Sequence, residues 1–333
     1  MPFYVSQAFE DLKIVGCSGP MQSLCSKISK LNDIDSTVLI LGESGTGKEL
    51  FARAIQRNSN RREEAFIAIN CAALSETLLE SELFGFRKGA FTDAKSNRKG
   101  YFETCSEGTL FLDEIGEMSP TTQAKILRVI QEKEFIPLGS CQPISINTRI
   151  IAATNRDLKK EMKEGRFRAD LYYRIAVLTL IIPPVRKRKE DIPLLIKYFS
   201  NFYADKFHKK IKKPKQNVLV KASSYDWPGN VRELQNAVER AVVLSDEGNL
   251  SLDDLLELSD DEKVADSPHQ SEDLQLVYSI AKKHFEQRYI ENLLFVSKGN
   301  IAEASRLSNQ YRHSLYRLIK KYDINIELFK DIR

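Results

Sequence analysis

The sequence contains no long run of apolar residues. None of its stretches approaches the ~18 consecutive apolar residues that a membrane-spanning helix needs. The N-terminal segment Met1–Gln7 also lacks the basic-then-apolar order of a signal peptide. We therefore expect a cytoplasmic protein with no membrane partner.

Cysteine and histidine are scarce. The five cysteines are scattered and never spaced as C-x-x-C, and with the four histidines they form no zinc pattern. Buried, reduced thiols are the simplest interpretation. A net charge of +4 is too small to indicate a polyanion partner by itself. The composition is that of an ordinary soluble protein, with 42% hydrophobic and 29% charged residues, so local motifs must indicate the function.

Residues 38–49 carry the motif around which the rest of the chain is arranged. Val38–Leu41 is a short apolar run that predicts a buried strand. The residues after it fit G-x-x-x-x-G-K, a loop whose backbone N–H groups cradle nucleotide phosphates at a helix N-terminus. The predicted nucleotide-binding residues are Gly42, Glu43, Ser44, Gly45, Thr46, Gly47, Lys48 and Glu49. The general motif has a magnesium-binding hydroxyl where this chain has Glu49, so the hydroxyl of Thr46 or of Ser44 is a candidate replacement.

Three further apolar runs end in polar residues. Residues 65–69 lead to Asn70, residues 108–112 lead to Asp113 and Glu114, and residues 149–153 lead to Thr154 and Asn155. Strands that alternate with helical segments predict an α/β fold, a parallel sheet with helices on both faces. Their polar ends are expected at the edge where such sheets bind ligands.

The adjacent acids Asp113 and Glu114 are the strongest candidates for catalysis. Two carboxylates after a buried strand are costly unless their charge is used. In a protein with a phosphate-binding loop, the first acid typically holds Mg²⁺ and the second orients or activates the attacking water. We assign Asp113 to the metal and Glu114 to the water. The alternative is a simple junction between strand and loop.

Residues 83–94 predict an exposed loop. Glycine in a helix interior costs about 1 kcal/mol relative to alanine, and this segment contains two glycines. A hairpin or loop that presents Phe91 fits the pattern better. An aromatic ring at the tip of such a loop suggests contact with a partner.

The segment after residue 165 is rich in arginine. Arg168 and Arg174 lie in a helical pattern, where they form a solvated face or serve a neighbouring subunit by stabilising charge on a transferring phosphoryl group. The basic run 186–188 is most simply a solvated face. From residue 192 to 244 the pattern is helical. Asn230 is predicted to cap its last helix with Glu233 reaching back.

Arg232 lies in the first turn of that helix, where the helix dipole disfavours a cation. This placement suggests a nucleotide phosphate as its partner. Residues 251–275 are acidic and polar and predict a linker.

The C-terminal segment has the layout of a helix-turn-helix. Residues 297–323 contain six basic and two acidic residues, a local charge of +4. A basic second helix after a small-residue first helix is typical of a major-groove reader. The residues predicted to face DNA are Arg312, His313, Ser314, Arg317 and Lys320. A three-helix interaction module is the alternative.

From about Ile14 to Ile324 the chain closely resembles the sigma-54-dependent transcriptional activators, a branch of the AAA+ ATPases also called bacterial enhancer-binding proteins. That family's phosphate loop also carries Glu after Lys. The resemblance implies a short segment at 1–13, an AAA+ α/β subdomain at 14–182 and a helical lid at 183–250. After the linker at 251–275, a Fis-type helix-turn-helix domain is expected at 276–333.

The resemblance also implies residue roles. Asn70 matches the residue that couples the catalytic glutamate to nucleotide state, and Thr154 with Asn155 matches the first sensor. Arg168 and Arg174 match the trans-acting arginines, and Arg232 matches the second sensor. ATP and Mg²⁺ are then expected at the subunit interfaces of a homo-oligomeric ring, commonly a hexamer. The segment Gly89, Ala90, Phe91, Thr92, Asp93 and Ala94 resembles the family's GAFTGA loop, which engages the sigma factor, with Asp93 in place of Gly.

We therefore predict an ATP-hydrolysing activator that binds upstream double-stranded DNA and remodels the sigma-54 RNA polymerase holoenzyme to the open complex. One alternative is a DNA-binding repressor whose AAA+ core does no remodelling, suggested by Asp93. Another is an AAA+ remodeller of a different protein, with the tail as an interaction domain. Members of the family usually carry an N-terminal sensory module, which this sequence lacks. Regulation by a separate protein, or no built-in repression, is therefore expected.

Overall fold

The computed structural model describes residues 12–250, apart from residues 33, 92, 93, 246 and 247. Further along, it describes residues 290, 293–294, 297, 299–308, 312–322 and 324. The chain divides into two compact units between Asp260 and Asp261, and each is described by itself. The predicted linker at 251–275 lies outside the described residues, as do Thr92 and Asp93. No helix in the described part of the chain is long and apolar enough to cross a membrane.

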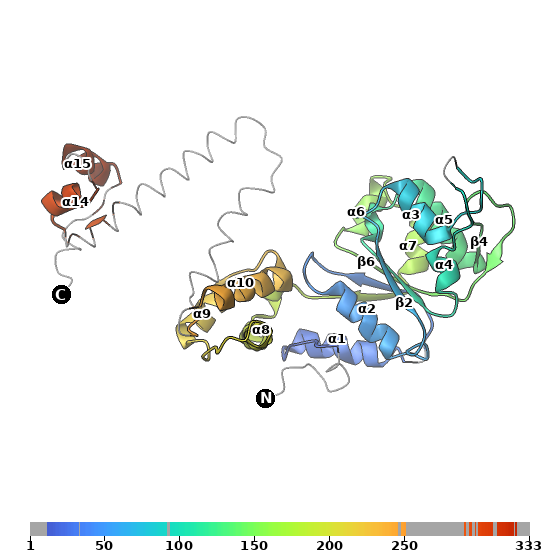
Figure 1. Cartoon of the computed structure of the whole chain (residues 1–333), viewed down its shortest axis with the longest axis horizontal. Helices are drawn as coiled ribbons and strands as arrows, with labels where there is room; N and C mark the ends of the chain where they lie inside the picture. The colour runs from blue at the N-terminus through green and yellow to red at the C-terminus, as the bar shows by residue number, and fades with distance from the viewer. Residues whose placement is uncertain are drawn as a thin grey trace. The chain divides into compact units, whose positions relative to one another are not determined.

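A parallel sheet of five strands runs through the first unit (Figure 1). Its strands are β2 (Phe66–Asn70), β3 (Thr109–Asp113), β6 (Arg149–Thr154), β1 (Val38–Leu41) and β7 (Leu178–Ile181), in that spatial order. The four predicted strands are therefore confirmed, as is the α/β class. The fifth, β7, was not predicted. It is an edge strand of four residues that buries only Leu180 fully, so its apolar pattern is weak.

The register of the strands brings the polar residues to one edge. Asn70 at the end of β2 pairs with Asp113 at the end of β3, and Leu41 at the end of β1 pairs with Thr154 at the end of β6. The glycine-rich loop follows Leu41 directly. The carboxyl ends of four neighbouring strands therefore meet around this loop.

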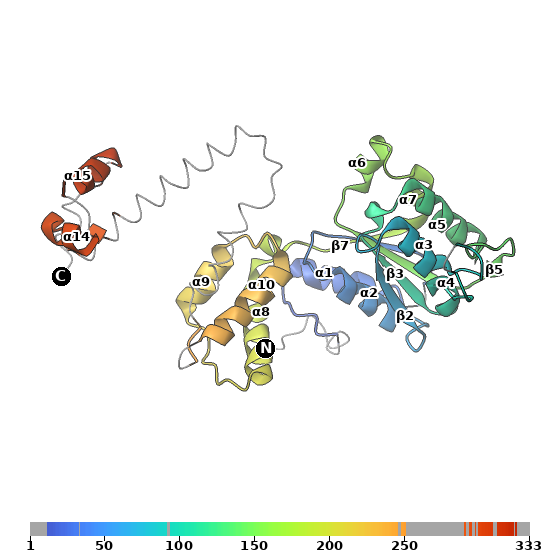
Figure 2. The same ribbon diagram turned by 45° about the horizontal axis from the view of Figure 1, so that its top comes forward.

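Helices cover both faces of the sheet, as Figure 2 shows. The helices α1 (Gly19–Ser29) and α2 (Lys48–Arg57) pack on one face. The other face carries α3 (Glu76–Phe84), α4 (Tyr101–Thr104), α5 (Pro120–Glu132), α6 (Leu158–Lys163) and α7 (Ala169–Ile175). Successive residues of a strand point to opposite faces. In β6, Ile150 and Ala152 therefore join one apolar core while Ile151 and Ala153 join the other.

The proline, glycine and cysteine of residues 133–147 predict a loop, and that prediction is wrong for four of these residues. β4 (Glu134–Phe135) and β5 (Ile144–Ser145) form a two-stranded antiparallel sheet. Phe135 is buried against Phe84 and Phe102. That burial anchors a hairpin too short to be recognised by its alternation. Short 3-10 turns η2 (Ile115–Glu117), η3 (Val185–Lys187) and η4 (Lys189–Asp191) complete the connections.

Three helices form the lid beside the sheet. They are α8 (Ile192–Lys206), α9 (Gln216–Ser224) and α10 (Asn230–Leu244), and they pack around the buried Trp227. In the second unit, α14 (Ile301–Ser308) and α15 (Arg312–Lys321) enclose a small core with Ile290 and Leu294. The two helices occupy the places where the helix-turn-helix was expected.

The start of α10 differs from the predicted capping box. Gly229, one residue earlier, is the N-cap, and its backbone N–H donates to Glu233 at 2.8 Å. Asn230 is fully buried with φ at 56°, and its side chain leaves the helix. Its Oδ1 accepts from the N–H of Val185 at 2.9 Å, and its Nδ2 donates to the carbonyl of Ser44 at 3.0 Å. Asn230 therefore joins the lid to the glycine-rich loop.

We expect Asn230→Ala to lower the free energy of unfolding by about 1–3 kcal/mol, because it leaves buried backbone groups at Val185 and Ser44 without their partner. Urea denaturation followed by the fluorescence of Trp227, the single tryptophan, measures this in the lid itself. Asn201→Ala, at an exposed position of α8, is the matched control and should leave the midpoint unchanged. Equal stability of the two variants would show that the bridge contributes nothing.

Candidate functional site

The glycine-rich loop has the backbone path that its glycines allow. Gly45 and Gly47 adopt φ values of 75° and 95°, which other residues rarely adopt. A Cβ on Gly45 would lie 2.2 Å from the carbonyl oxygen of Gly229, so only glycine fits between loop and lid. The loop ends at the N-terminus of α2, a helix of ten residues that begins with Lys48. Free N–H groups and the helix dipole make this terminus attractive to an anion.

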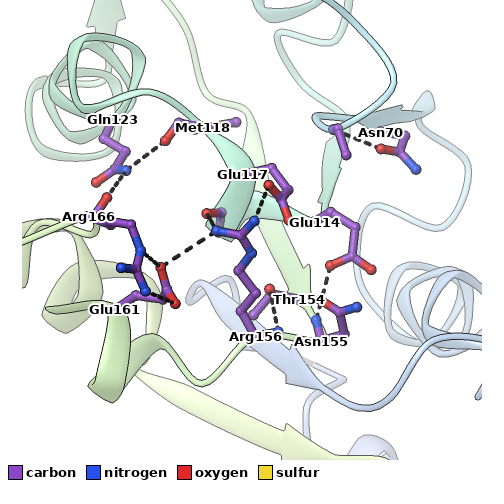
Figure 3. Close-up of polar contacts among 12 residues, drawn as sticks. Asn70, Glu114, Glu117, Met118, Gln123, Thr154, Asn155, Arg156, Glu161 and Arg166 are labelled. Atoms are coloured by element: carbon purple, nitrogen blue, oxygen red, sulfur yellow. Dashed lines mark hydrogen bonds and ion pairs between the residues drawn. The ribbon is translucent and has the colours of Figure 1, made fainter. Parts of the chain in front are cut away.

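Lys48 and Glu114 form an ion pair at the centre of the site. The Nζ of Lys48 lies 3.0 Å from Oε1 of Glu114 and donates to the carbonyl of Gly42 at 3.2 Å. Only 6% of the lysine side chain and 16% of the glutamate side chain are exposed. The second oxygen of Glu114 accepts from the backbone N–H of Asn155 at 3.0 Å (Figure 3). The carboxylate is therefore held from two sides.

The backbone of Glu114 is itself unusual. Its φ is 53°, in the left-handed region that non-glycine residues enter at a cost of about 1–3 kcal/mol. Such strain persists where surrounding contacts enforce it, and the two bonds to the Glu114 carboxylate are contacts of this kind. The conformation turns the chain sharply after β3, so that Asp113 and Glu114 both face the loop.

Asp113 is half-buried beside this pair. Burial raises the pKa of its carboxyl, which the charge of Lys48 opposes and that of Glu114 reinforces. One of its oxygens accepts from the N–H of Glu114 at 3.1 Å. No group of three or more metal-ligating side chains occurs among the described residues. A single carboxylate suits Mg²⁺, which is commonly bound through one or two carboxylates together with substrate phosphates.

Both candidate hydroxyls for the magnesium ligand are hydrogen-bonded within the loop and lid. Thr46 donates its hydroxyl to the carbonyl of Glu43 at 2.7 Å, and Ser44 accepts from Arg232 at 3.3 Å. Glu49 pairs with Arg53 on the surface of α2, at 2.7 Å, although it also borders the cavity. Its carboxylate is occupied there, so Glu49 is a weaker metal ligand than Asp113.

A cavity of about 750 Å³ joins the loop to the lid, within the range typical of small-molecule sites. Its polar end contains the loop, Asn70, Asp113 and Glu114. The other end is largely apolar, with Ile14 and Val15 from the N-terminal segment. Leu195, Tyr198 and Phe199 of α8 also line that end. A ligand with phosphates at one end and a flat apolar ring at the other fits this division.

Thr154, predicted as part of the first sensor, and Asn70, predicted to couple to the glutamate, lie at the same edge of the sheet. Thr154 is buried, and its hydroxyl accepts from the N–H of Arg156 at 3.1 Å. Asn70 faces the site, but its Oδ1 accepts from the N–H of Ala72 at 2.9 Å and makes no bond to Glu114 (Figure 3). The structure therefore brings these residues together without yet coupling Asn70 to the glutamate.

The lid contacts the loop through residues that the sequence did not reveal. Arg186 donates to both carboxylate oxygens of Glu43, one of them at 2.7 Å, and holds the pKa of that carboxyl below its usual range. The prediction that 186–188 is a solvated face is therefore wrong for Arg186, which is ion-paired, and for Arg188, which is buried, whereas Lys187 is exposed. A glutamate inside a phosphate-binding loop needs a cationic partner, and that was the available signal. Arg232 was predicted at this site, and it contacts Ser44.

Arg168 and Arg174 do not reach the site of their own chain. Neither lines the cavity. Arg168 pairs with Asp170 on the surface of α7, at 2.7 Å. Arg174 is exposed in the last turn of α7, and in the described part of the chain it makes no ion pair.

The structure describes part of the loop around Phe91 and part of the C-terminal segment. Phe91 is 46% exposed, and its ring packs edge-on against Phe86 with centroids 4.9 Å apart. Gly89 and Ala94 close the loop through a backbone hydrogen bond of 2.9 Å. In the tail, Arg317 is exposed on α15, the helix that also carries Arg312, His313, Ser314 and Lys320. The side chains of those four residues lie outside the described residues.

Comparison with known proteins places these features in a family. Residues 14–181 match the model of the sigma-54 interaction domain, and residues 186–272 match that of the AAA+ ATPase lid domain. A signal-transduction and transcriptional-control protein of Clostridium beijerinckii is 44% identical over 96% of this chain. The transcriptional regulatory protein ZraR of Klebsiella oxytoca is 47% identical over 88% of it. This chain spans 49% of the first relative's length and 65% of the second's.

Among solved structures, NtrX from Brucella abortus in complex with ATP is similar, with a TM-score of 0.69 and 31% identity. The similarity covers 93% of this chain and 70% of that one. A yeast Hsp104 complex with casein is 18% identical with a TM-score of 0.50, which shows a shared fold alone.

The ion pair between Arg186 and Glu43 predicts a pH-dependent contribution to stability. The folded-state pKa of Glu43 lies below its unfolded value, about 4.3, so the contribution is present above that pH and is lost as the pH falls through the folded-state pKa. Both side chains are more than a third exposed, so screening limits the pair to about 0.2–1 kcal/mol. A double-mutant cycle of Glu43→Gln and Arg186→Met, measured by urea denaturation from pH 7 downward, should show this coupling fade. A coupling energy that is independent of pH would contradict it.

Proposed function

The chain belongs to the family defined by the sigma-54 interaction domain, and from that premise we propose that it is an ATP-dependent transcriptional activator. In this proposal it hydrolyses ATP and uses the energy to remodel the sigma-54 RNA polymerase holoenzyme into an open complex on promoter DNA. The observation that carries the proposal is the meeting of Lys48, Asp113 and Glu114 around one cavity.

Each residue of the site has a chemical task in this proposal. The N–H groups of the loop and Lys48 bind the phosphates, and Asp113 holds a magnesium ion, which neutralises phosphate charge when bound. Glu114 accepts a proton from the attacking water as general base. In this structure its carboxylate accepts hydrogen bonds from Lys48 and Asn155. It becomes available to the attacking water when Lys48 pairs with the phosphates instead. Arg232 and Thr154 sense the nucleotide, and Asn70 engages Glu114 in one nucleotide state.

We place the active site between two copies of the chain. The guanidinium of Arg174 makes no ion pair among residues 12–250, and a guanidinium from a neighbouring subunit stabilises charge that develops on a transferring phosphoryl group. Tyr173 and Val177, which lie close to it in the chain, are 73% and 57% exposed, so large exposed side chains flank this arginine. Such a surface suits contact with a second copy. The proposal includes a homo-oligomeric ring, commonly a hexamer, as the family resemblance implies.

Two further segments complete the proposal. The loop from Gly89 to Ala94 presents Phe91 to the sigma factor, and the tail binds upstream DNA through α15. The repressor alternative stays a prediction from Asp93, which lies outside the described residues, and no observation favours it. The same holds for remodelling of a different protein.

We expect Glu114→Gln to reduce ATP hydrolysis by about 10²–10⁴-fold, because it removes the general base. Nucleotide binding should be retained or become tighter, since the amide no longer competes for Lys48. Phosphate release, nucleotide binding and open-complex formation on a sigma-54 promoter are the measurements. Glu132→Gln, an exposed change on α5, is the control. Hydrolysis at the control rate, or activation that persists, would rule out this mechanism.

A mixing experiment tests whether Arg174 acts between subunits. Lys48→Ala and Arg174→Ala proteins are each expected to be inactive. Mixed rings should regain part of the ATPase activity, because some interfaces then combine an intact loop with an intact arginine. Lys48→Ala mixed with Glu114→Gln is the control and should stay inactive, since both residues serve the same subunit's nucleotide. Recovery in both mixtures or in neither would contradict an arginine supplied in trans.

A further inference from the structure

A lysine-rich loop lies at the end of the lid helix α8, where it connects to α9. Within residues 206–215 there are six lysines and no acidic residue, and the lysine side chains are all exposed. The net charge of the whole chain is +4, so the other 323 residues sum to −2. The net positive charge of this protein is therefore concentrated in a few segments. This loop has a net charge of +6, compared with +4 for residues 297–323.

Two of these lysines are engaged within the lid and four are not. Lys206 pairs with Glu239 at 3.5 Å, and Lys209 donates to the carbonyl of Val243 at the end of α10. The other four have no ion-pair partner in the described part of the lid. They are Lys210, Lys212, Lys213 and Lys215. Like charges this close repel one another unless an anion neutralises them.

The loop is held in a fixed path despite this repulsion. The N–H of Lys212 donates to the carbonyl of Gly248 at 2.8 Å. Gly248 has φ at 77°, and a Cβ there would lie 2.2 Å from the carbonyl oxygen of Lys210, so the two segments touch closely. Phe207 and Ile211 turn inward and pack on the lid core. A rigid scaffold therefore presents the free lysines to solvent, which lowers the entropy lost when they bind.

We propose that this lysine-rich loop, residues 206–215, is a second DNA-binding surface that contacts the phosphate backbone of double-stranded DNA. Only the choice of duplex DNA rests on the proposed function. Single-stranded nucleic acid is usually bound through exposed aromatic rings, and Phe207, the one phenylalanine, tyrosine or tryptophan of this loop, packs against Tyr203. A membrane surface would need exposed apolar side chains, whereas Ile211 is turned inward. Exposed lysines without accompanying aromatic or apolar side chains bind the phosphates of a duplex independently of base sequence.

The test is the salt dependence of DNA binding by the full chain. The loop variant is Lys210→Gln/Lys212→Gln/Lys213→Gln. On a duplex of unrelated sequence, its plot of log affinity against log salt should lose about 0.9 in slope for each lysine that contacts a phosphate. The matched control is Lys159→Gln/Lys160→Gln/Lys163→Gln, which removes three exposed lysines of α6 that also lack ion pairs in the described unit. The control should keep the slope of the unmodified chain.

A tail variant separates this proposal from the proposed function. In Arg312→Gln/Arg317→Gln/Lys320→Gln, affinity for an upstream site should fall while the loop's share of the slope remains. If only the loop variant changes the slope, the loop binds DNA and the assignment of the tail fails. A loop variant that keeps the slope of the control on duplex DNA overturns the proposal. So does a loss seen only on single-stranded RNA or on vesicles of anionic lipid.

Discussion

The ion pair between Lys48 and Glu114 is the contact on which the site depends. Both side chains are largely buried, and a buried charge without a partner is strongly destabilising, by about 3–5 kcal/mol when one partner is removed. The lysine therefore needs a counter-charge whether or not a ligand is present. Phosphates carry more negative charge than one carboxylate, so we expect them to replace Glu114 as the ion-pair partner of Lys48. In the proposed function, the lysine assigned to the nucleotide would therefore also control when the glutamate is available to the water.

A chain of hydrogen bonds and ion pairs connects Glu114 with Arg168. Glu114 accepts from the backbone of Asn155, and the next residue, Arg156, pairs with Glu117 and with Glu161 (Figure 3). Glu161 in turn binds Arg166, whose carbonyl accepts from Gln123, and Gln123 accepts from the N–H of Arg168. These hydrogen bonds and ion pairs form a continuous chain of contacts from Glu114 to Arg168, the N-cap of α7.

Much of this arrangement could be predicted from the sequence, because some of its signals are local. An apolar run followed by glycines and a lysine predicts a strand, a loop and a helix together. Asp113 and Glu114 are recognisable because two adjacent carboxylates after a buried strand cost free energy unless a partner binds them. The edge strand β7 and the hairpin at Phe135 could not be found, since each depends on packing by distant residues. Asn230 resembled a helix cap because its neighbours satisfy that pattern, whereas its bonds to Val185 and Ser44 exist only in three dimensions. Arg186 and the lysines at 206–215 resemble ordinary solvated charge until their partners, or lack of partners, are known.

The lid is fastened at two separate places, and this constrains how it can respond to a ligand. Asp191, fully buried at the start of α8, accepts from the N–H groups of Cys17 and Ser18 at 2.6 and 2.8 Å. That attachment ends on residues 17 and 18, outside the phosphate-binding loop. The second attachment, through Asn230 and Arg232, ends on Ser44 in the phosphate-binding loop itself. A ligand that draws Arg232 toward its phosphates therefore alters one attachment and leaves the other. The expected motion of the lid is a rotation about Asp191 that changes the width of the cavity.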